Sequence, residues 1–273
     1  MTGRRSSVLE LAVGGLPFPH GGPDGEWRYR HAVRLDGPGP LDRQAVSDFL
    51  TYEHAHGRRV TVVADGRLSR WDTWRPPSER PSPGSFPTQC CTDAFPDGCG
   101  ASLVCHGAPA AVAVEILRSG ALLAATAVTG RTGTRLAADS TWGEPSDYFD
   151  HVMLANGRCR APEAVALSRS LGRDLVPADL RRGYPPAVRF YFRWETLSER
   201  DDAVFDGVHP VKVPQRLALD EALVAVVVTA GHRDIVAPSM PRRLRDRLAI
   251  VDVDRPAPDA WAAAALDAAA DIG

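Results

Sequence analysis

Lysine is almost absent from this 273-residue sequence. Of its 32 basic residues, only Lys212 is a lysine and the rest are arginines. Together with abundant alanine, proline and glycine, this bias is typical of a GC-rich genome, so arginine richness alone indicates no arginine-specific function. A net charge of −2 gives no overall basic field. The charge therefore does not demand a nucleic-acid partner, although a local basic face stays open.

Long apolar runs are missing as well. No stretch approaches the roughly 20 apolar residues of a membrane helix. Residues 1–15 contain no apolar core long enough for a signal peptide. A hydrophobic content of 44% and a charged content of 24% are those of an ordinary soluble globular protein. We therefore expect a cytoplasmic protein with no membrane partner.

Cysteines are few, and their number is odd. The five are Cys90, Cys91, Cys99, Cys105 and Cys159. An odd count without a secretion signal argues against a disulfide framework. The four that lie between residues 90 and 105 allow a zinc site, although their spacing lacks paired C-x-x-C motifs. The alternative is that they are buried, reduced thiols.

Several common catalytic motifs are also missing. The sequence contains no G-x-x-x-x-G-K-[ST], no H-E-x-x-H, no G-x-S-x-G and no G-x-G-x-x-G after a strand. The enzyme classes that these motifs mark are therefore not indicated.

The N-terminal part of the chain has its own pattern of elements. Residues 27–35 alternate as a strand does, residues 41–57 have a helical pattern that ends at Gly57, and residues 58–65 form a β-branched run. Proline and serine gather in residues 73–88, which predicts a linker there. We therefore predict a β-α-β extension with a proline-rich linker over residues 1–85.

Residues 86–273 form the second predicted domain. Residues 126–142 are rich in Thr, Gly and Arg and lack periodicity, which predicts an irregular, functional loop. Many short strands with few helices indicate an α+β fold with a split or strongly twisted sheet. The predicted strands are residues 148–155, 187–194 and the buried run 221–230. The predicted helices are residues 109–119 and 161–174. Residues 241–254 and 258–271 together are predicted to form a helix, a strand and a final helix.

The junction at Cys105-His106-Gly107 is the clearest candidate for chemistry. An apolar run ends there, and a helical pattern follows from Pro109 and closes at Gly120. We interpret His106 as a polar side chain delivered into a cleft, followed by a glycine that lets a ligand approach the backbone. The helical pattern places Val112, Ile116 and Leu117 on one face.

The segment "CHGAPAAVAVEILRSGALL" resembles the first strand and helix of the ADP-ribosyltransferase superfamily, in which the strand ends in His-Gly and the helix in "ILxxGL". The segments "DYFDHVML" and "LDEALVAVVV" match the family's aromatic residue and its later glutamate. The resemblance covers roughly residues 100–230 and is closest in layout to the branch that modifies nucleic-acid bases. It implies a split, twisted sheet, with residues 86–273 as the catalytic domain.

The resemblance also implies a set of site residues. Glu221 and His106 would be catalytic, while His106, Gly107, Arg131, Arg135 and Tyr148 would bind NAD as the co-substrate. A carboxylate can stabilise the charge that builds on the ribose as the nicotinamide bond breaks, and an arginine can bind the diphosphate. Members that modify arginine carry Glu or Gln two residues before the glutamate, where this chain has Leu219. The acceptor therefore stays open among nucleic-acid bases, proteins and small molecules.

Two other classes of function remain alternatives. The first is cysteine-dependent acyl transfer or hydrolysis, with Cys105 or Cys91 as the nucleophile and His151 or His209 as the base. The second is a non-enzymatic binding module, in which the arginine-rich segment 241–250 contacts an acidic partner.

Overall fold

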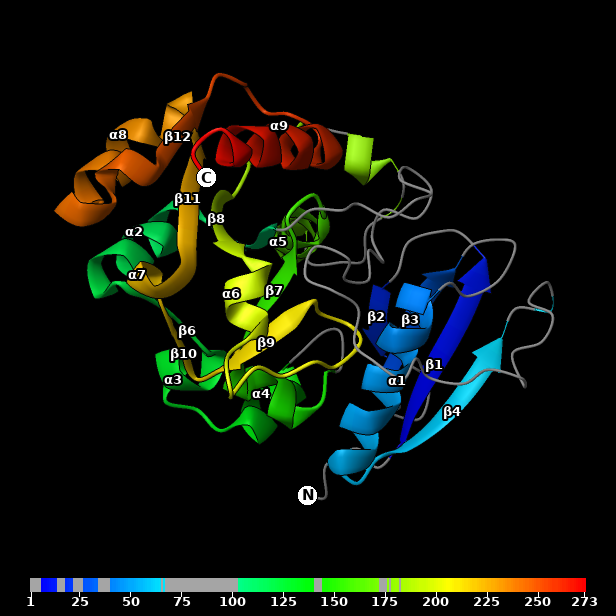
Figure 1. The fold of residues 1–273 in the computed structure, drawn as a ribbon. Coiled ribbons are helices and arrows are strands. Elements are labelled where there is room, and N and C mark those ends of the chain that lie inside the picture. The colour runs from blue at the N-terminus through cyan, green and yellow to red at the C-terminus, as the bar shows by residue number, and fades with distance from the viewer. Residues whose placement is uncertain are drawn as a thin grey trace. The chain divides into compact units, whose positions relative to one another are not determined.

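The computed structural model describes residues 6–13, 18–21, 27–33, 40–64, 66, 103–139, 144–171, 176, 178–181 and 183–273 (Figure 1). Helices and strands alternate in these residues around a twisted, multistranded sheet, so the predicted α+β class is confirmed. The predicted linker and the cysteines Cys90, Cys91 and Cys99 lie outside the described residues.

The chain divides into two compact units that differ from the predicted domains in their segments. Unit 1 consists of Met1–Gly100, Leu123–Met153 and Asp201–Arg216. Unit 2 consists of Ala101–Leu122, Leu154–Arg200 and Leu217–Gly273. The N-terminal part is thus grouped with two later segments of the chain, and each unit is described by itself below.

The N-terminal part of unit 1 is a four-stranded sheet of order β2-β3-β1-β4 with one helix. Its elements are β1 Ser6–Val13, β2 Phe18–Gly21, β3 Trp27–Val33, α1 Pro40–Ala55 and β4 Arg59–Ala64. The predicted strands and helix of this region are confirmed, and Gly57 has the left-handed φ of +71° that ends the helix. The central strand β1 was not predicted; it pairs in parallel with both β3 and β4.

The core of unit 1 is aromatic. Trp27 stacks on Phe49 of α1 with ring centroids 5.5 Å apart, and Leu9 and Leu11 of β1 fill the same cluster. The remaining elements are α3 Ala125–Thr129, α4 Gly133–Asp139, the 3-10 turn η4 Ser146–Asp150 and β9 Val211–Pro214. The prediction of an irregular loop over 126–142 is therefore wrong for most of that segment. Alanines there support two short, largely exposed helices despite the nearby glycines.

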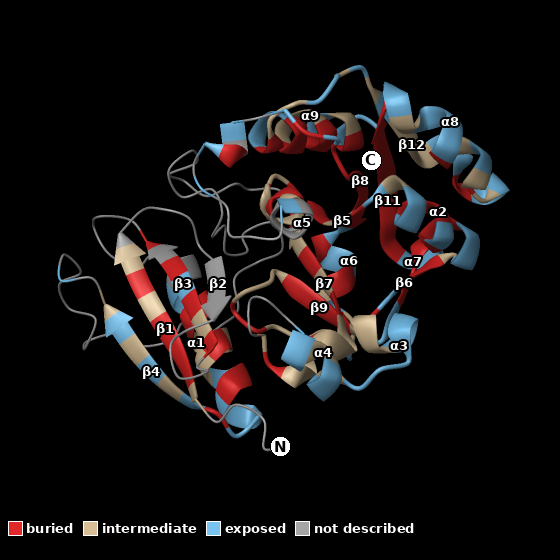
Figure 2. Ribbon diagram, turned by 180° about the vertical axis from the view of Figure 1, so that it is seen from behind, coloured by how far each residue is buried: buried red, intermediate tan, exposed pale blue. Residues whose placement is uncertain are grey.

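The larger sheet has the order β12-β11-β8-β5-β7-β9. Its strands in unit 2 are β5 Leu103–Ala108, β8 Val188–Arg193, β11 Leu223–Thr229 and β12 Leu248–Val251, and β7 His151–Asn156 continues from unit 1 into unit 2. β11 is buried at every residue, as predicted for its apolar run, whereas β4 of unit 1 is partly exposed along its length (Figure 2).

The described helices of unit 2 are α2 Ala110–Ser119, α5 Ala161–Leu171, α6 Trp194–Ser198, α7 Leu219–Ala222, α8 Arg233–Val236 and α9 Pro258–Ala270. Of these, α5, α6, α8 and α9 contact strands of this sheet. Short pieces are β6 Ala121–Leu123, which pairs with β10 Arg216–Ala218, and the 3-10 turns η5 Asp179–Arg181, η6 Ala230–His232, η7 Ala237–Ser239 and η8 Arg242–Arg247. Trp261 of α9 lies in a buried cluster with Tyr191 of β8 and Val227 of β11.

The predicted helix after β5 is confirmed as α2, which ends at Gly120 with a left-handed φ of +68°. Its predicted apolar face needs one correction. Val112 is 50% exposed, and the buried face is formed by Ala113, Val114, Ile116 and Leu117. At about 100° per residue the buried arc runs from Ile116 through Ala113 and Leu117 to Val114, and Val112 lies about 40° beyond the Ile116 edge of it. No helix in the described part of the chain is long and apolar enough to cross a membrane.

Candidate functional site

His106 and Gly107 lie on β5, where the sequence places them. His106 is half-buried and pairs across the sheet with Phe190 of β8. A Cβ atom at Gly107 would lie 2.7 Å from the Cβ atom of Pro162 in α5. Close packing of α5 on the strand therefore requires the glycine in this unit, whether or not a ligand also approaches it.

Glu221 lies on the helical turn α7, two residues before β11 begins at Leu223. Its side chain is 46% exposed and forms an ion pair with Arg200. The neighbouring Asp220 pairs with Arg243 at 3.2 Å. Glu221 is thus a surface carboxylate on a turn that leads directly into the fully buried strand.

His106 on β5 and Glu221 on α7 belong to the same unit, and α7 leads into β11 of the sheet that contains β5. β8 separates β5 from β11; His106 pairs with Phe190, and Leu223 pairs with Phe192. With a strand spacing of about 4.8 Å and a rise of about 3.3 Å per residue, the α-carbons of His106 and Leu223 lie roughly 12 Å apart. A ligand of dinucleotide size can span such a separation.

The other predicted NAD-binding residues, Arg131, Arg135 and Tyr148, belong to unit 1. Arg131 is exposed, forms an ion pair with Asp139 of α4, and donates a hydrogen bond to the Arg135 carbonyl oxygen at 3.3 Å. Tyr148 is fully buried. The predicted NAD site is therefore distributed over two units, and its assembly stays a prediction.

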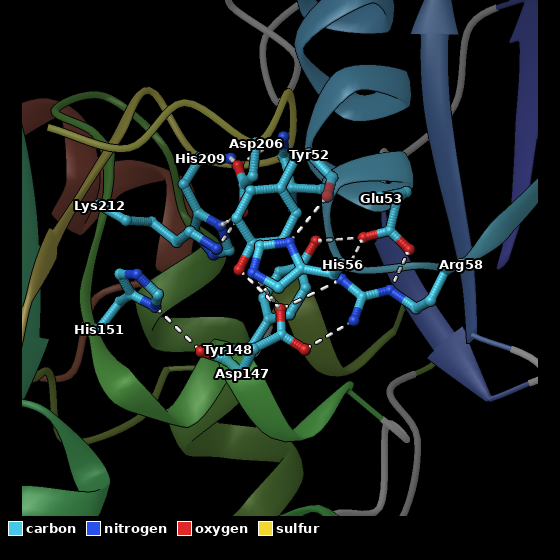
Figure 3. A network of polar contacts seen from close by, with 11 residues as sticks. Tyr52, Glu53, His56, Arg58, Asp147, Tyr148, His151, Asp206, His209 and Lys212 are labelled. Carbon is cyan, nitrogen blue, oxygen red and sulfur yellow. Dashed lines mark hydrogen bonds and ion pairs between the residues drawn. The ribbon is translucent and has the colours of Figure 1, made fainter. Parts of the chain in front are cut away.

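Tyr148 belongs to a buried network in unit 1 that the sequence did not reveal (Figure 3). The Nζ atom of Lys212 lies 3.9 Å from the ring centroid of Tyr148 and 3.9 Å from that of Tyr52. Its third contact is the Oδ2 atom of Asp206, at 3.0 Å. Because an ammonium is attracted to the face of an aromatic ring, these three groups form a cage around the cation.

Asp206 is the anionic side of this cage. Its Oδ1 atom accepts hydrogen bonds from the backbone N–H groups of Val208 at 2.9 Å and His209 at 2.7 Å, and its Oδ2 atom accepts one from His209 Nδ1 at 3.0 Å. Burial alone would raise the pKa of Asp206, but Lys212 and His209 hold it well below its usual range. At Lys212 the effect of burial on the pKa is larger than the opposite effect of the Asp206 charge, so the pKa of the amine is lowered.

A second layer of charges joins α1 to the turn η4. Asp147 accepts hydrogen bonds from the Tyr52 hydroxyl at 2.7 Å and from Arg58 NH1 at 2.6 Å. Arg58 also binds Glu53 through Nε at 2.7 Å and NH2 at 2.9 Å, and Ser7 donates to the same carboxylate. Burial would raise the pKa of Asp147, but the hydrogen bonds from Arg58 and Tyr52 lower it.

Three histidines border this network. His56 Nδ1 lies 2.8 Å from the Tyr52 carbonyl oxygen, and His151 Nδ1 lies 2.9 Å from the Asp147 carbonyl oxygen. A carbonyl oxygen only accepts, so Nδ1 carries the hydrogen and Nε2 keeps its lone pair in the neutral form. Burial and the charge of Lys212 lower the pKa of His151. Within the described residues, no group of three or more His, Cys, Asp or Glu side chains is placed to hold a metal ion.

One feature of the sequence could have drawn attention to the cage, although we attributed it to genome composition. Lys212 is the single lysine of a chain that otherwise uses arginine. An arginine carries five N–H donors in a rigid plane, whereas a lysine ends in a compact point charge that can face two rings and one carboxylate. The pairing of Tyr52 with Asp206 and Tyr148 was invisible in the sequence, because these residues lie in three distant segments.

Unit 2 has its own buried ion pair, between Arg189 of β8 and Glu163 of α5. Arg189 Nε donates to Glu163 Oε1 at 2.8 Å, and NH2 pairs with Oε2 of the same carboxylate. NH1 donates to the Gly157 carbonyl oxygen at 2.9 Å and NH2 to that of Cys159 at 2.7 Å. The guanidinium is thus fully surrounded by acceptors, as expected of a structural arginine.

Cys105 lies against this pair, with its Sγ atom 3.6 Å from Arg189 NH1. It is fully buried, and burial raises the pKa of its thiol to about 12. Almost none of it is therefore thiolate at neutral pH, which argues against Cys105 as a nucleophile.

Comparisons with protein-family models, with curated proteins and with solved structures found no match to this chain.

Proposed function

We propose that this chain is an NAD-dependent ADP-ribosyltransferase, which cleaves the nicotinamide–ribose bond of NAD and transfers ADP-ribose to an acceptor. The observation that carries the proposal is the presence of two features in one unit, one on a strand of the larger sheet and one on the turn that leads into another strand of it. β5 brings His106-Gly107 directly before α2, and the exposed carboxylate of Glu221 stands directly before the buried strand β11. Both features match the segments on which the family resemblance depends.

Glu221 would act on the ribose. Breaking the nicotinamide bond builds positive charge on the ribose, and a fixed carboxylate beside it stabilises that charge. The buried strand that follows and the ion pair with Arg200 both restrict where this carboxylate can go. The same group can also orient or deprotonate the acceptor.

His106 and Gly107 would hold the nicotinamide riboside. A histidine ring nitrogen can bond a ribose hydroxyl, and the glycine backbone can pair with the carboxamide. Arg131 and Arg135 stay candidates for the diphosphate, because both are exposed guanidinium groups. We leave Tyr148 out of the proposed site, since its ring is buried and Lys212 lies over it.

The acceptor is proposed only as a class: a nucleic-acid base, a protein or a small molecule. The test is mass spectrometry after incubation with NAD and each acceptor class, looking for an added ADP-ribose. Glu221→Gln is the variant expected to slow the addition roughly 100- to 1000-fold, and Asp220→Asn is its matched control because it removes the adjacent carboxylate. If neither the wild type nor the Asp220→Asn control transfers ADP-ribose, the proposal is contradicted. If nicotinamide is released without transfer, the activity is NAD hydrolysis only.

A further inference from the structure

We propose that Tyr52, Tyr148 and Asp206 form a binding site for an ammonium group. The ammonium of Lys212 occupies this site and thereby holds three segments of unit 1 together. The cage draws its members from three segments that are distant in sequence: Tyr52 from α1, Tyr148 from η4, and Asp206 with Lys212 from residues 206–212. One side chain therefore connects all three.

The approach of the 206–212 segment to α1 is supported by a separate observation. Gly207 has a left-handed φ of +71°, and a Cβ atom there would overlap the Ala45 carbonyl oxygen and lie 2.7 Å from the Phe49 nitrogen. The backbone of this segment is thus in direct contact with α1. The ammonium contact and the backbone contact fix the same pair of segments at two points.

The chemistry of the cage favours a primary ammonium. Two ring faces at 3.9 Å from a single nitrogen, with one carboxylate, suit a compact point charge, whereas a guanidinium stacked on the rings would also need in-plane acceptors for its five N–H donors. The ammonium has lost its water, since Lys212 is 0% exposed. If the lysine leaves, Asp206 keeps His209 and its two backbone donors but loses the counter-charge on its other side, which disfavours the open form.

The first test uses the fact that the chain has one lysine. An amine-acylating reagent followed by peptide mass spectrometry should modify native Lys212 at least 100-fold more slowly than the new amine of an Arg118→Lys variant, whose position is 63% exposed. Equal rates for the two amines would overturn the proposal. This measurement needs no substitution in the cage.

The second test is chemical rescue. Lys212→Ala should raise hydrogen exchange in α1 and in residues 144–150 at least 100-fold, while exchange in β8 and β11 changes less than threefold. n-Propylammonium should reverse most of this rise, and n-propanol, which has a similar size but no charge, should not. Rescue by neither compound, or by both equally, would overturn the ammonium site. If the variant does not fold, the same pair of compounds is compared on its refolding yield, with the same outcomes.

Discussion

Lys212 in unit 1 and Arg189 in unit 2 are both fully buried cations, and the molecule holds them in different ways. Arg189 meets a carboxylate in a forked pair and two backbone carbonyl oxygens. Lys212 meets one carboxylate and two ring faces. The arginine is therefore satisfied by hydrogen bonds, and the lysine mainly by charge and ring contacts.

The pKa directions follow this difference. Burial lowers the pKa of both cations, but Glu163 outweighs burial at Arg189 and raises its pKa well above the usual value. At Lys212 burial outweighs Asp206, and its pKa falls. The surroundings of the buried arginine in unit 2 therefore favour its charged form, whereas burial disfavours the charged form of the lysine in unit 1.

The largest expected effect is the loss of the Arg189 pair. Arg189→Met leaves Glu163 charged and buried without its partner, so the free energy of unfolding should fall by about 3–5 kcal/mol. Urea unfolding followed by circular dichroism measures this change. Arg193→Met, on the same strand but exposed, should cost less than about 0.5 kcal/mol. Equal costs at the two positions would show that the buried fork has no special role.

The next effect concerns the approach of residues 206–212 to α1. Gly207→Ala must overcome both the left-handed backbone and the overlap with α1, so we expect a loss of about 2–4 kcal/mol. Gly130→Ala is the control, because Gly130 has a φ of +62° but nothing within 4 Å of an added Cβ atom. It should cost only about 1–2 kcal/mol, which is the backbone contribution alone. If Gly207→Ala lowers the free energy of unfolding no more than Gly130→Ala does, the contact between residue 207 and α1 does not contribute to stability.

A smaller effect is expected from acid. The folded pKa values of Asp206 and Asp147 lie below the unfolded value of about 3.9, so their contribution is present above that pH and is lost as pH falls through the folded values. Below about pH 4 the protection of α1 amides, which is the intrinsic exchange rate at that pH divided by the observed rate, should therefore fall by an amount equivalent to a loss on the order of 1–2 kcal/mol. Asp147→Asn should weaken this pH dependence. If Asp147→Asn shows the same pH dependence as the wild type, groups other than Asp147 cause that dependence.

The elements that the sequence predicted share a clear local pattern. α1 ends at Ala55, two residues before Gly57, α2 ends at Ser119, directly before Gly120, and the apolar runs became β8 and β11. Capping glycines and β-branched runs act within a few residues, so a sequence window contains the whole cause.

The elements that were missed depend on distant partners. β1 is a strand because it lies between β3 and β4, and Lys212 is buried because Tyr52 and Tyr148 come from other segments. The candidate site shows the same limit. His106-Gly107 could be found from local pattern, but the packing of Pro162 that requires Gly107 could not.

The smallest stability effect and the sharpest functional effect are expected at the same residue. Glu221 is 46% exposed and its partner Arg200 is also at the surface, so Glu221→Gln should change the free energy of unfolding by less than about 0.5 kcal/mol. Its carboxylate should matter in the transition state rather than in NAD binding.

The most direct test of the proposed function is therefore nicotinamide release from NAD by the wild type and by Glu221→Gln, with NAD affinity measured in parallel. We predict that the variant binds NAD nearly as well as the wild type and turns it over roughly 100- to 1000-fold more slowly, the size expected for losing one preorganised charge contact. Turnover by the variant at the wild-type rate would contradict the assignment of the chemistry to Glu221.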